Sequence, residues 1–335
     1  MKIIKNLNLF YRAARGYSLP MSVFSWSVPF IFGTVDGGKI SYGILALIGI
    51  LFAHLGVNLF DDFADFLIAK RKVKSQSDYS KILQKGKCSY LFDGSLTILQ
   101  LLLLIIVCFT LALIIGVFLT LKTGIIVVYV MLTTAILGCL YPFLTYIALG
   151  EITVGIIFAP LLYIGVYYVM TKSFSFELLP LAFSTGLLTV GLLHAHMFFD
   201  YDFDKKNNKI TLCSLAKSKQ NAVNNQALIM YIAYANIVLF SSLGLIFEKI
   251  LSPIYLLTIL SIPTATVLLK LMEKDVLGQE TEIKPNILYG YLGNLDLYEK
   301  IGNKNFMIKF LVARNVMVEF TFLLCIAKII SETIK

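Results

Sequence analysis

The sequence predicts an all-α integral membrane protein that crosses the bilayer about nine times. Of its 335 residues, 58% are hydrophobic and only 15% are charged, whereas soluble domains carry about 25% charged residues. Several apolar runs reach the roughly 20 residues that an α-helix needs to cross a bilayer. These runs are continuously apolar and lack the alternation of transmembrane strands. We predict spans over residues 18–36, 42–68, 95–119, 124–144, 150–170, 177–200, 223–247, 252–272 and 310–332.

The distribution of basic residues predicts how these spans are oriented. The N-terminal segment and the loops after spans 2, 6 and 8 are rich in Lys and Arg, whereas the loops after spans 1, 3, 5 and 7 carry one Lys each. Because basic loops stay in the cytoplasm, we expect the N-terminus inside and the C-terminus outside. This topology accounts for the net charge of +9, so we expect no nucleic-acid partner. The cytoplasmic membrane of a prokaryote is the expected location.

The polar segments between the spans do not divide the chain into separate domains. We predict one transmembrane domain over residues 1–335, in which the basic residues 1–17 form an interfacial segment. Two cytoplasmic loops are expected at 69–94 and 201–222, and a long polar cytoplasmic loop at 273–309. The lipid bilayer is therefore the main partner of the surface, and the sequence specifies no oligomeric state.

Two acidic clusters lie at the ends of spans 2 and 6, where a bilayer tolerates charge poorly. They consist of Asn58, Asp61, Asp62 and Asp65 in the first cluster and of Asp200, Asp202 and Asp204 in the second. Residues spaced i, i+3, i+4 and i+7 share one face of a helix, so the first four side chains are expected to converge on one cation. Asp200 and Asp204 share a face with His196, and Asp202 points away. Carboxylates at such depth are usually functional.

Hard oxygen ligands of this kind indicate Mg²⁺, which binds a few carboxylates and keeps positions for water and phosphate oxygens. Two facing clusters are suited to two Mg²⁺ ions with a diphosphate between them. Basic side chains of the adjoining loops would neutralise the remaining charge; the candidates are Lys70, Arg71, Lys205, Lys206 and Lys209. If the leaving partner is allylic, aromatic faces would stabilise its positive charge; the candidates are Tyr129, Tyr141, Tyr163, Tyr167, Tyr168 and Phe199.

Intramembrane carboxylates also serve proton relays and ion-coupled transport, so a transporter is the competing class of function. Transporters tend to carry polar or Gly/Pro breaks in the middle of spans in matched halves. Here the acidic residues are at the ends of spans and are followed by basic loops, which favours an enzyme that handles a diphosphate. His194 and His196 are equally compatible with a structural and a catalytic role.

The two clusters resemble the signatures of the UbiA superfamily of intramembrane prenyltransferases. Asn58, Asp61, Asp62 and Asp65 fall on the pattern N-x-x-[ND]-D-x-x-D, and Asp200 and Asp204 fall on D-x-x-x-D. The segment 205–212 is similar to the continuation G-[KR]-[KR]-T-L, although Asn208 stands where Gly is usual. The resemblance implies a nine-span helical fold with a central cavity facing the cytoplasm. It also implies Mg²⁺-dependent transfer of a polyprenyl group from a prenyl diphosphate to an aromatic acceptor.

Two further stretches resemble the branch of the family that prenylates 1,4-dihydroxy-2-naphthoate in menaquinone synthesis. Residues 14–20 are similar to A-R-P-x-T-L-P, and residues 149–168 are similar to L-G-E…F-F-G-P…G-T-Y-Y. This resemblance places Arg15 and Glu151 in the site; we add as substrate-binding candidates Tyr141, Tyr168 and His196.

The segment before the second cluster departs from that branch. The branch has an Asn-Asn pair and an Arg where this chain has His196-Met197 and Phe199. The acceptor therefore stays open between 1,4-dihydroxy-2-naphthoate, which we predict first, and 4-hydroxybenzoate, a prenylated glycerol phosphate or a haem.

Overall fold

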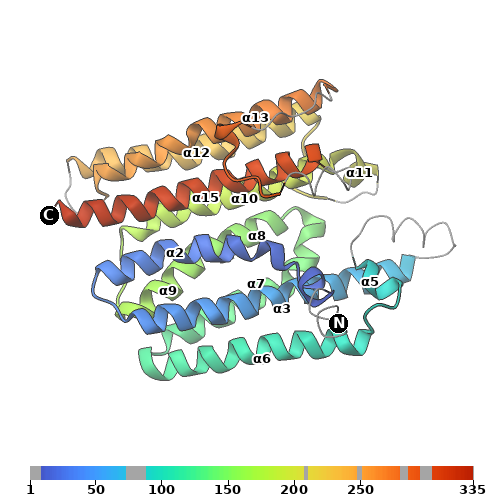
Figure 1. Cartoon of the computed structure of the whole chain (residues 1–335), viewed down its shortest axis with the longest axis horizontal. Coiled ribbons are helices and arrows are strands. Elements are labelled where there is room, and N and C mark those ends of the chain that lie inside the picture. Colours follow the sequence, from blue (N-terminus) through green and yellow to red (C-terminus); the bar gives the residue numbers. More distant parts are fainter. Residues whose placement is uncertain are drawn as a thin grey trace.

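The fold is a bundle of long helices whose axes run in nearly the same direction (Figure 1). The computed structural model describes residues 9–72, 88–206, 210–246, 251–279, 286–294 and 304–334. Within these ranges, nine helical stretches are long and apolar enough to cross a membrane. The predicted all-α fold with about nine spans is therefore confirmed.

Most spans are single helices, and two are formed by consecutive shorter elements. The long elements are α2 (Leu19–Val35), α3 (Ile40–Lys72), α6 (Ile98–Thr123), α7 (Ile126–Leu144), α8 (Gly150–Ile156) followed by α9 (Leu162–Thr171), α10 (Leu178–Phe199), α12 (Lys219–Gly244), η4 (Pro253–Ser261) followed by α13 (Ile262–Val276), and α15 (Lys304–Thr333). The short elements are η1 (Gly16–Ser18), α5 (Ser89–Phe92), η2 (Thr145–Ile147), η3 (Ile157–Leu161), α11 (Tyr201–Lys206) and η5 (Ile287–Tyr289).

Several helices extend beyond the spans predicted from hydropathy. Helix α3 continues through Lys72, α12 begins at Lys219, and α15 begins at Lys304, inside segments predicted as loops. The predicted loops at 69–94 and 201–222 also contain α5 and α11. The reason is physical, because hydropathy detects only the part of a helix that lies in hydrocarbon. Polar turns at the ends of a helix carry no such signal.

The fifth span changes its helical geometry at a proline. Pro160 has no backbone N–H and cannot continue the regular i to i−4 hydrogen bonds. The chain accommodates it in one π-helical turn, η3, between α8 and α9. Such turns are frequent at functional sites, and this one separates the short helix α8, which carries Glu151 in its first turn, from the rest of the span.

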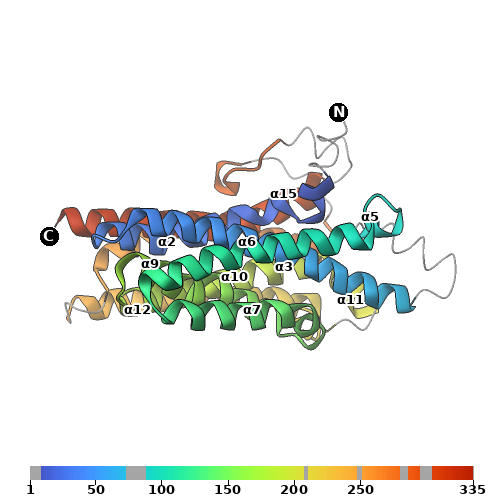
Figure 2. The ribbon, with the colours of Figure 1, turned by 90° about the horizontal axis from the view of Figure 1, so that it is seen from below.

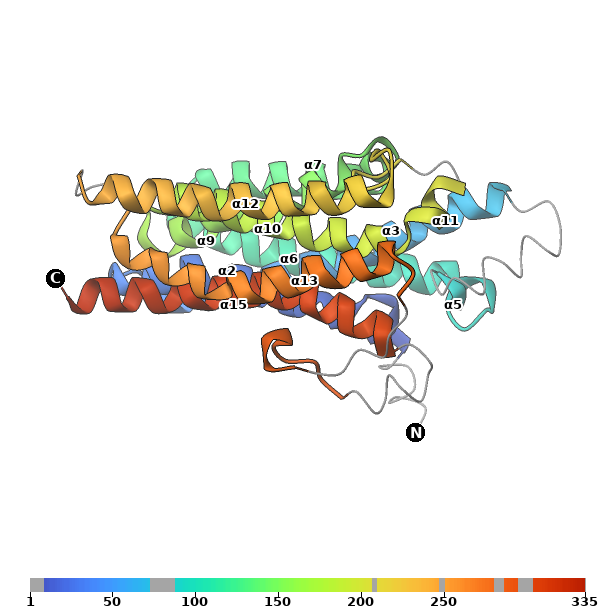
Figure 3. The same ribbon diagram turned by 90° about the horizontal axis from the view of Figure 1, so that it is seen from above.

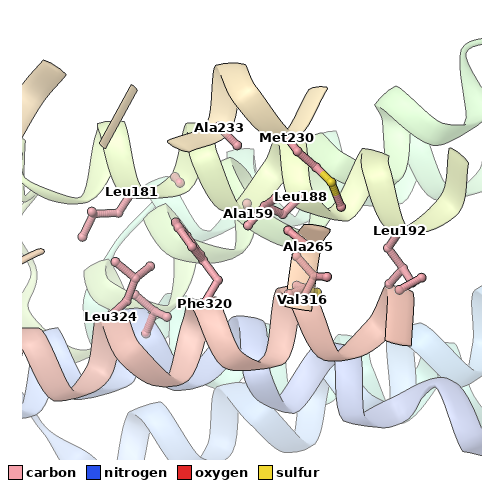
Figure 4. Packing of buried hydrophobic residues seen from close by; sticks show 14 of the residues in the cluster. Ala159, Leu181, Leu188, Leu192, Met230, Ala233, Ala265, Val316, Phe320 and Leu324 are labelled. Atoms are coloured by element: carbon pink, nitrogen blue, oxygen red, sulfur yellow. The ribbon is translucent and has the colours of Figure 1, made fainter. Parts of the chain in front are cut away.

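Helix α10 is the central element of the bundle. It packs against α12, α15 and α8. In its most apolar stretch of 18 residues, 78% is buried inside the protein. Figure 4 shows Val316, Phe320 and Leu324 of α15 beside the leucines of α10. Since lipid tails are as apolar as these side chains, close packing rather than the hydrophobic effect holds such helices together.

Small residues allow α8 and α10 to approach at backbone distance. A Cβ added to Gly155 would lie 2.9 Å from the carbonyl oxygen of Gly186, and a Cβ added to Gly186 would lie 3.2 Å from that of Gly155. Small residues at helix contacts are typical of membrane bundles. The close approach fixes the position of α8 relative to α10, which leads into the second acidic cluster.

Both acidic clusters lie at the same end of the bundle, which we call the acidic end. The last turns of α3 and the short helices α5 and α11 are found there in all three views (Figures 1, 2 and 3). Helix α15 finishes at the opposite end. The two clusters were predicted to face the same side of the membrane, and this arrangement is what a shared site requires.

The opposite end is held by a buried lysine. The Lys328 side chain is only 3% exposed, and its Nζ lies 3.1 Å from Asp36, 3.4 Å from Glu177 and 3.0 Å from Glu332. These carboxylates follow α2, precede α10 and end α15. Buried charges persist when they are paired, so this cluster ties three helices together far from the acidic end.

The contact between α8 and α10 predicts a stability effect. Gly155→Ala forces a methyl group against the backbone of Gly186 and should destabilise the fold by about 1–3 kcal/mol. Thermal unfolding in detergent measures this. The matched control is Gly49→Ala, whose Cβ would meet only the side chain of Ile115 at 3.2 Å. The control should unfold at or above the wild-type temperature because Ala favours helix by about 1 kcal/mol. Equal melting temperatures for the two variants would contradict the close approach.

Candidate active site

The first acidic cluster lies on the last turns of α3. The side chains of Asp61 and Asp62 are buried, with the residues 5% and 4% exposed, and Asn58 and Asp65 are partly buried. Leu59 and Phe66 of the same turns pack into a local apolar core. The helix therefore presents an apolar face and a carboxylate face within the same two turns, as the spacing of the motif predicts.

Arg15 is the cation that compensates this pair of carboxylates. Its Nη2 lies 2.9 Å from Oδ2 of Asp61 and also contacts Oδ1 of Asp62. Burial lowers the pKa of Arg15, but Asp62 and Asp61 outweigh burial and hold the pKa above its ordinary value. The guanidinium therefore stays charged, and one nitrogen bridges two carboxylates in the way a metal ion would.

Tyr90 holds the other oxygen of Asp62. Its phenol O–H donates a hydrogen bond of 2.8 Å to Oδ2 of Asp62, and the residue is only 9% exposed. Burial raises the pKa of Tyr90, and the Asp62 carboxylate raises it further, so the phenol keeps its proton. Tyr90 belongs to α5, which folds back onto α3 after the segment that follows the first cluster.

A polar ladder joins α3 to the chain just before the first span. Nδ2 of Asn58 donates to the carbonyl oxygen of Ala14 at 3.0 Å and to Oγ of Ser18 at 3.2 Å. One turn earlier, the His54 ring pairs with Ser18 at 3.0 Å and with Ser22 at 2.7 Å. These bonds fix Arg15, which lies between Ala14 and Ser18 and adopts a positive φ of 50°.

The second acidic cluster lies where α10 gives way to α11. Helix α10 ends at Phe199, and Asp200 caps it with φ −97° and ψ 5°. The backbone N–H of Asp204 still bonds to the carbonyl oxygen of Asp200 at 2.8 Å, so the two aspartates remain one turn apart. Asp200 is exposed and Asp204 is 2% exposed. Asp202 instead pairs with Lys219 at 2.8 Å.

Glu151 holds the segment that follows the second cluster. It is 4% exposed, and its Oε1 accepts a 3.0 Å hydrogen bond from the backbone N–H of Leu212. Nearby, the N–H of Ala148 donates to the carbonyl oxygen of Ile210 at 2.9 Å. Burial raises the pKa of the Cys213 thiol to about 12, with further contributions from Glu151 and Asp204, which shows that both carboxylates are close to this segment.

Helices α7 and α8 connect the two halves of the acidic end. Helix α3 packs on α7, and α7 packs on α8, which carries Glu151. A Cβ added to Gly138 of α7 would lie 3.0 Å from Val57 of α3, one residue before the first motif. Tyr141, one turn further along α7, acts electrostatically on Arg15. Tyr141 therefore lies near the first cluster, as a substrate-binding role requires.

His196 stands in an aromatic cluster beside the second motif. Its ring stacks on Phe310 with centroids 3.7 Å apart and planes 9° apart. The Phe306 ring stacks on Phe310 with centroids 6.3 Å apart, and it meets the Phe199 ring edge-on with centroids 6.0 Å apart. Nε2 of His196 is buried without a hydrogen-bond partner. These rings line α10 and α15 one turn before Asp200.

Tyr168, which was predicted to bind substrate, lies away from both acidic clusters. Its hydroxyl donates to the carbonyl oxygen of Thr123 at 3.2 Å, at the last residue of α6 and thus at the end of the bundle opposite the acidic clusters. Tyr167 bonds to Asp36 at the same opposite end, at 2.8 Å. Both belong to the end of the family-like segment 149–168, but α9 carries them across the membrane. Tyr129 is 64% exposed on α7, and its ring cannot line an interior site.

The predicted diphosphate-binding residues are described only in part. Lys70 is exposed on the last turn of α3. Lys205 is exposed on α11, with its Nζ 5.1 Å from the centroid of the Tyr201 ring. The backbone of Arg71 belongs to α3, but its side chain and that of Lys206 are not described, and Lys209 lies outside the described residues. The two described lysines are therefore both placed at the acidic end.

Sequence reasoning missed Tyr90, His54 and Ser18. Tyr90 lies in a polar segment with no recognisable pattern. The only indication of a contact with Asp62 is that a single loop separates the two residues in the sequence. Ser18, Ser22 and His54 are polar residues inside apolar runs. Such residues usually face the interior of a bundle and pair with one another. The sequence could therefore have indicated that Ser18 and His54 contact each other.

The donor atoms of the first cluster fit a hard divalent cation. Carboxylate and amide oxygens are the ligands of Mg²⁺, and Asp61 and Asp62 already share the positively charged Nη2 of Arg15. In the described ranges, no three His, Cys, Asp or Glu side chains are arranged to hold one ion. A bound Mg²⁺ would therefore rely on a pair of carboxylates, with phosphate oxygens and water completing its shell.

The comparisons with known proteins agree with this architecture. A family model described as the UbiA prenyltransferase family matches residues 22–276, which is most of the chain. The chain belongs to the UbiA prenyltransferase family. The prediction of an enzyme of the prenyltransferase class is thereby confirmed over the competing class of function, a transporter. The nine apolar helices and the family together identify an integral membrane protein.

Solved structures of this family share the fold. A digeranylgeranylglyceryl phosphate synthase matches with a TM-score of 0.58 and 15% identity over 97% of this chain and 99% of its own. A UbiA homologue from Archaeoglobus fulgidus bound to GPP and Mg²⁺ matches with a TM-score of 0.56 and 15% identity, over 94% and 99%. An apo homologue from Aeropyrum pernix K1 gives 0.55 and 12%, over 93% and 98%. A comparison with curated protein sequences gives no match.

The role of Glu151 can be tested at the segment that it holds. Glu151→Ala leaves the partly buried N–H of Leu212 without this acceptor, a loss of about 1–3 kcal/mol. Hydrogen exchange of the peptide that contains Leu212 should become at least tenfold faster. Glu151→Gln keeps a carbonyl acceptor and should exchange close to the wild-type rate. Unchanged exchange in the Ala variant would show that Glu151 does not hold this segment.

Proposed function

We propose that this protein transfers a polyprenyl group from an allylic prenyl diphosphate to an aromatic acceptor, with Mg²⁺ as cofactor and diphosphate as product. The observation that carries the proposal is the presence of both acidic clusters at one end of the bundle. A buried carboxylate pair that already holds a cation, Arg15 on Asp61 and Asp62, supports a metal-binding role. The family assignment supplies the class of reaction.

Each cluster has an assigned task in this proposal. The buried pair Asp61 and Asp62 holds one Mg²⁺, with Asn58 and Asp65 of the same motif beside it, and Asp200 and Asp204 hold a second. Mg²⁺, when bound, supplies positive charge to the diphosphate oxygens and makes diphosphate a better leaving group. The diphosphate would also contact basic residues that follow the clusters in the sequence, which are Lys70, Arg71, Lys205 and Lys209.

The transfer itself requires few groups of the protein. The bond between C1 of the prenyl chain and the diphosphate oxygen breaks, and its electron pair leaves with the diphosphate. A ring carbon of the acceptor bonds to C1, and the ring regains aromaticity by losing a proton or, for 1,4-dihydroxy-2-naphthoate, its carboxyl group as CO₂. Aromatic faces stabilise the positive charge that develops on C1, and Tyr141, which acts electrostatically on Arg15, is the candidate that we favour.

The aromatic cluster beside Asp200 supports an aromatic acceptor. His196, Phe199, Phe306 and Phe310 give a wall of rings one turn before the second motif. The unpartnered Nε2 of His196 suits a hydroxyl group of such an acceptor. We keep 1,4-dihydroxy-2-naphthoate as the first choice, on the motif resemblance of residues 14–20 and 149–168. The proposed place is the cytoplasmic membrane of a prokaryote, with the acidic end in the cytoplasm.

The proposal is tested by assaying the purified protein with one prenyl diphosphate and a panel of acceptors. The panel contains 1,4-dihydroxy-2-naphthoate, 4-hydroxybenzoate, a prenylated glycerol phosphate and haem, and mass spectrometry identifies the lipid product. We expect a prenylated product that needs Mg²⁺ and disappears with EDTA. Product from glycerol phosphate or haem alone would contradict the aromatic acceptor, and no product from any acceptor would contradict the activity.

The same assay distinguishes the aspartates that are proposed to bind Mg²⁺ from Asp202, which is not. Asp62→Asn, Asp200→Asn and Asp204→Asn should each lower turnover by at least about 100-fold, because a ligating charge is lost. Asp202→Asn is the matched control, since Asp202 points to Lys219 and away from the site. It should retain turnover within a few fold of wild type. Normal turnover by Asp62→Asn or Asp200→Asn would refute the metal assignment.

A further inference from the structure

Asp62 is held on both of its carboxylate oxygens, by groups that come from different parts of the chain. Arg15, from the segment before α2, contacts Oδ1, and Tyr90, from α5, donates to Oδ2 at 2.8 Å. The first partner carries a full positive charge and the second is neutral. This difference determines what each can do when a divalent cation approaches the same carboxylate.

Arg15 is a competitor for the metal. Its Nη2 bridges Oδ2 of Asp61 and Oδ1 of Asp62, which is the position that a cation shared by these carboxylates would take. Two positive charges on the same oxygens repel each other strongly in a partly buried site. Divalent binding to this pair and the Arg15 ion pair therefore exclude each other.

Tyr90 has no charge and leaves room for the metal. A carboxylate offers about four acceptor positions on its two oxygens, and the Tyr90 hydrogen bond uses one of them. Such a bond fixes the plane of the carboxylate without neutralising it. Hydrogen-bond partners of metal ligands typically contribute 10–100-fold to metal affinity.

The position of Tyr90 is itself rigid. The neighbouring Leu91 and Cys88 are buried in the same local core as Leu59 and Phe66 of α3. Backbone hydrogen bonds from Leu91 to Cys88 and from Leu96 to Tyr90, each 2.9 Å long, close the turn around it. A short helix packed in this way can hold the phenol at a constant place while Arg15 leaves.

We propose that Tyr90 is a positioning residue for the first metal site. Its O–H orients the Asp62 carboxylate for a divalent cation, and Arg15 occupies the Asp61–Asp62 pair until that cation arrives. Neither acidic motif of the sequence includes Tyr90. The inference rests on the proposed function only in taking Asp62 as a metal ligand.

The test measures Mn²⁺ binding to the purified full chain by electron paramagnetic resonance, without substrates. Tyr90→Phe removes the donor and should weaken Mn²⁺ binding about tenfold. The matched control is Tyr163→Phe, which removes a buried hydroxyl bonded to Thr185 at 3.0 Å and should bind Mn²⁺ as wild type does. Arg15→Gln removes the competitor and should tighten binding severalfold, in the opposite direction from Tyr90→Phe.

A thermal melt without metal separates positioning from folding. Tyr90→Phe and Tyr163→Phe should melt within a few degrees of each other, although only the first loses Mn²⁺ affinity. If Tyr90→Phe does not fold, Tyr90→p-aminophenylalanine keeps the ring and a donor and should bind Mn²⁺ within threefold of wild type. Wild-type affinity in a folded Tyr90→Phe variant, or a tenfold loss in the p-aminophenylalanine variant, would overturn the positioning role.

The outcome also separates this inference from the proposed function. Asp62→Asn should weaken Mn²⁺ binding more than Tyr90→Phe does. If Asp62→Asn has no effect, the metal assignment itself fails. If Asp62→Asn weakens binding but Arg15→Gln weakens it too, Arg15 supports the metal site and the competition between them is refuted.

Discussion

The constraint on which the acidic end depends is the cost of burying two carboxylates beside hydrocarbon. Asp61 and Asp62 are 5% and 4% exposed, and a buried charge without a partner is strongly destabilising. Arg15 supplies the compensating charge, so the segment before α2 must lie on α3. Tyr90 supplies a second bond, so α5 must fold back onto the same turns. The local core of Leu59, Phe66 and their neighbours follows from these two contacts.

The second cluster differs from the first in how its carboxylates are accommodated. Helix α10 is the most deeply packed span, and it ends at Phe199 just before Asp200 becomes exposed. Glu151 then holds the backbone of Leu212, which keeps the chain after α11 on α8. One cluster is thus covered by buried partners and the other is partly open to solvent.

The nine spans and the sharing of one end by both clusters were predictable, because apolar length and basic loops carry that information. Helical spacing also predicts that Asp202 points away from Asp200 and Asp204, whereas its pairing with Lys219 is seen only in the structure. The partners of the first cluster were not predictable, since Tyr90 and Ala14 reach it across long sequence separations. Tyr168 shows the converse failure. It belongs to a family-like segment, but that segment crosses the membrane, and only the path of α9 reveals that its end lies away from the site.

The central claim is that both acidic clusters bind one phosphorylated substrate through metal ions. An experimental structure with Mn²⁺ and a non-hydrolysable prenyl thiodiphosphate tests it most directly, because anomalous scattering locates manganese. The account predicts a diphosphate between the two clusters, with one manganese on Asp62 and its neighbours and another on Asp200 and Asp204. A diphosphate bound with no manganese at either cluster, or one bound away from both, would contradict it.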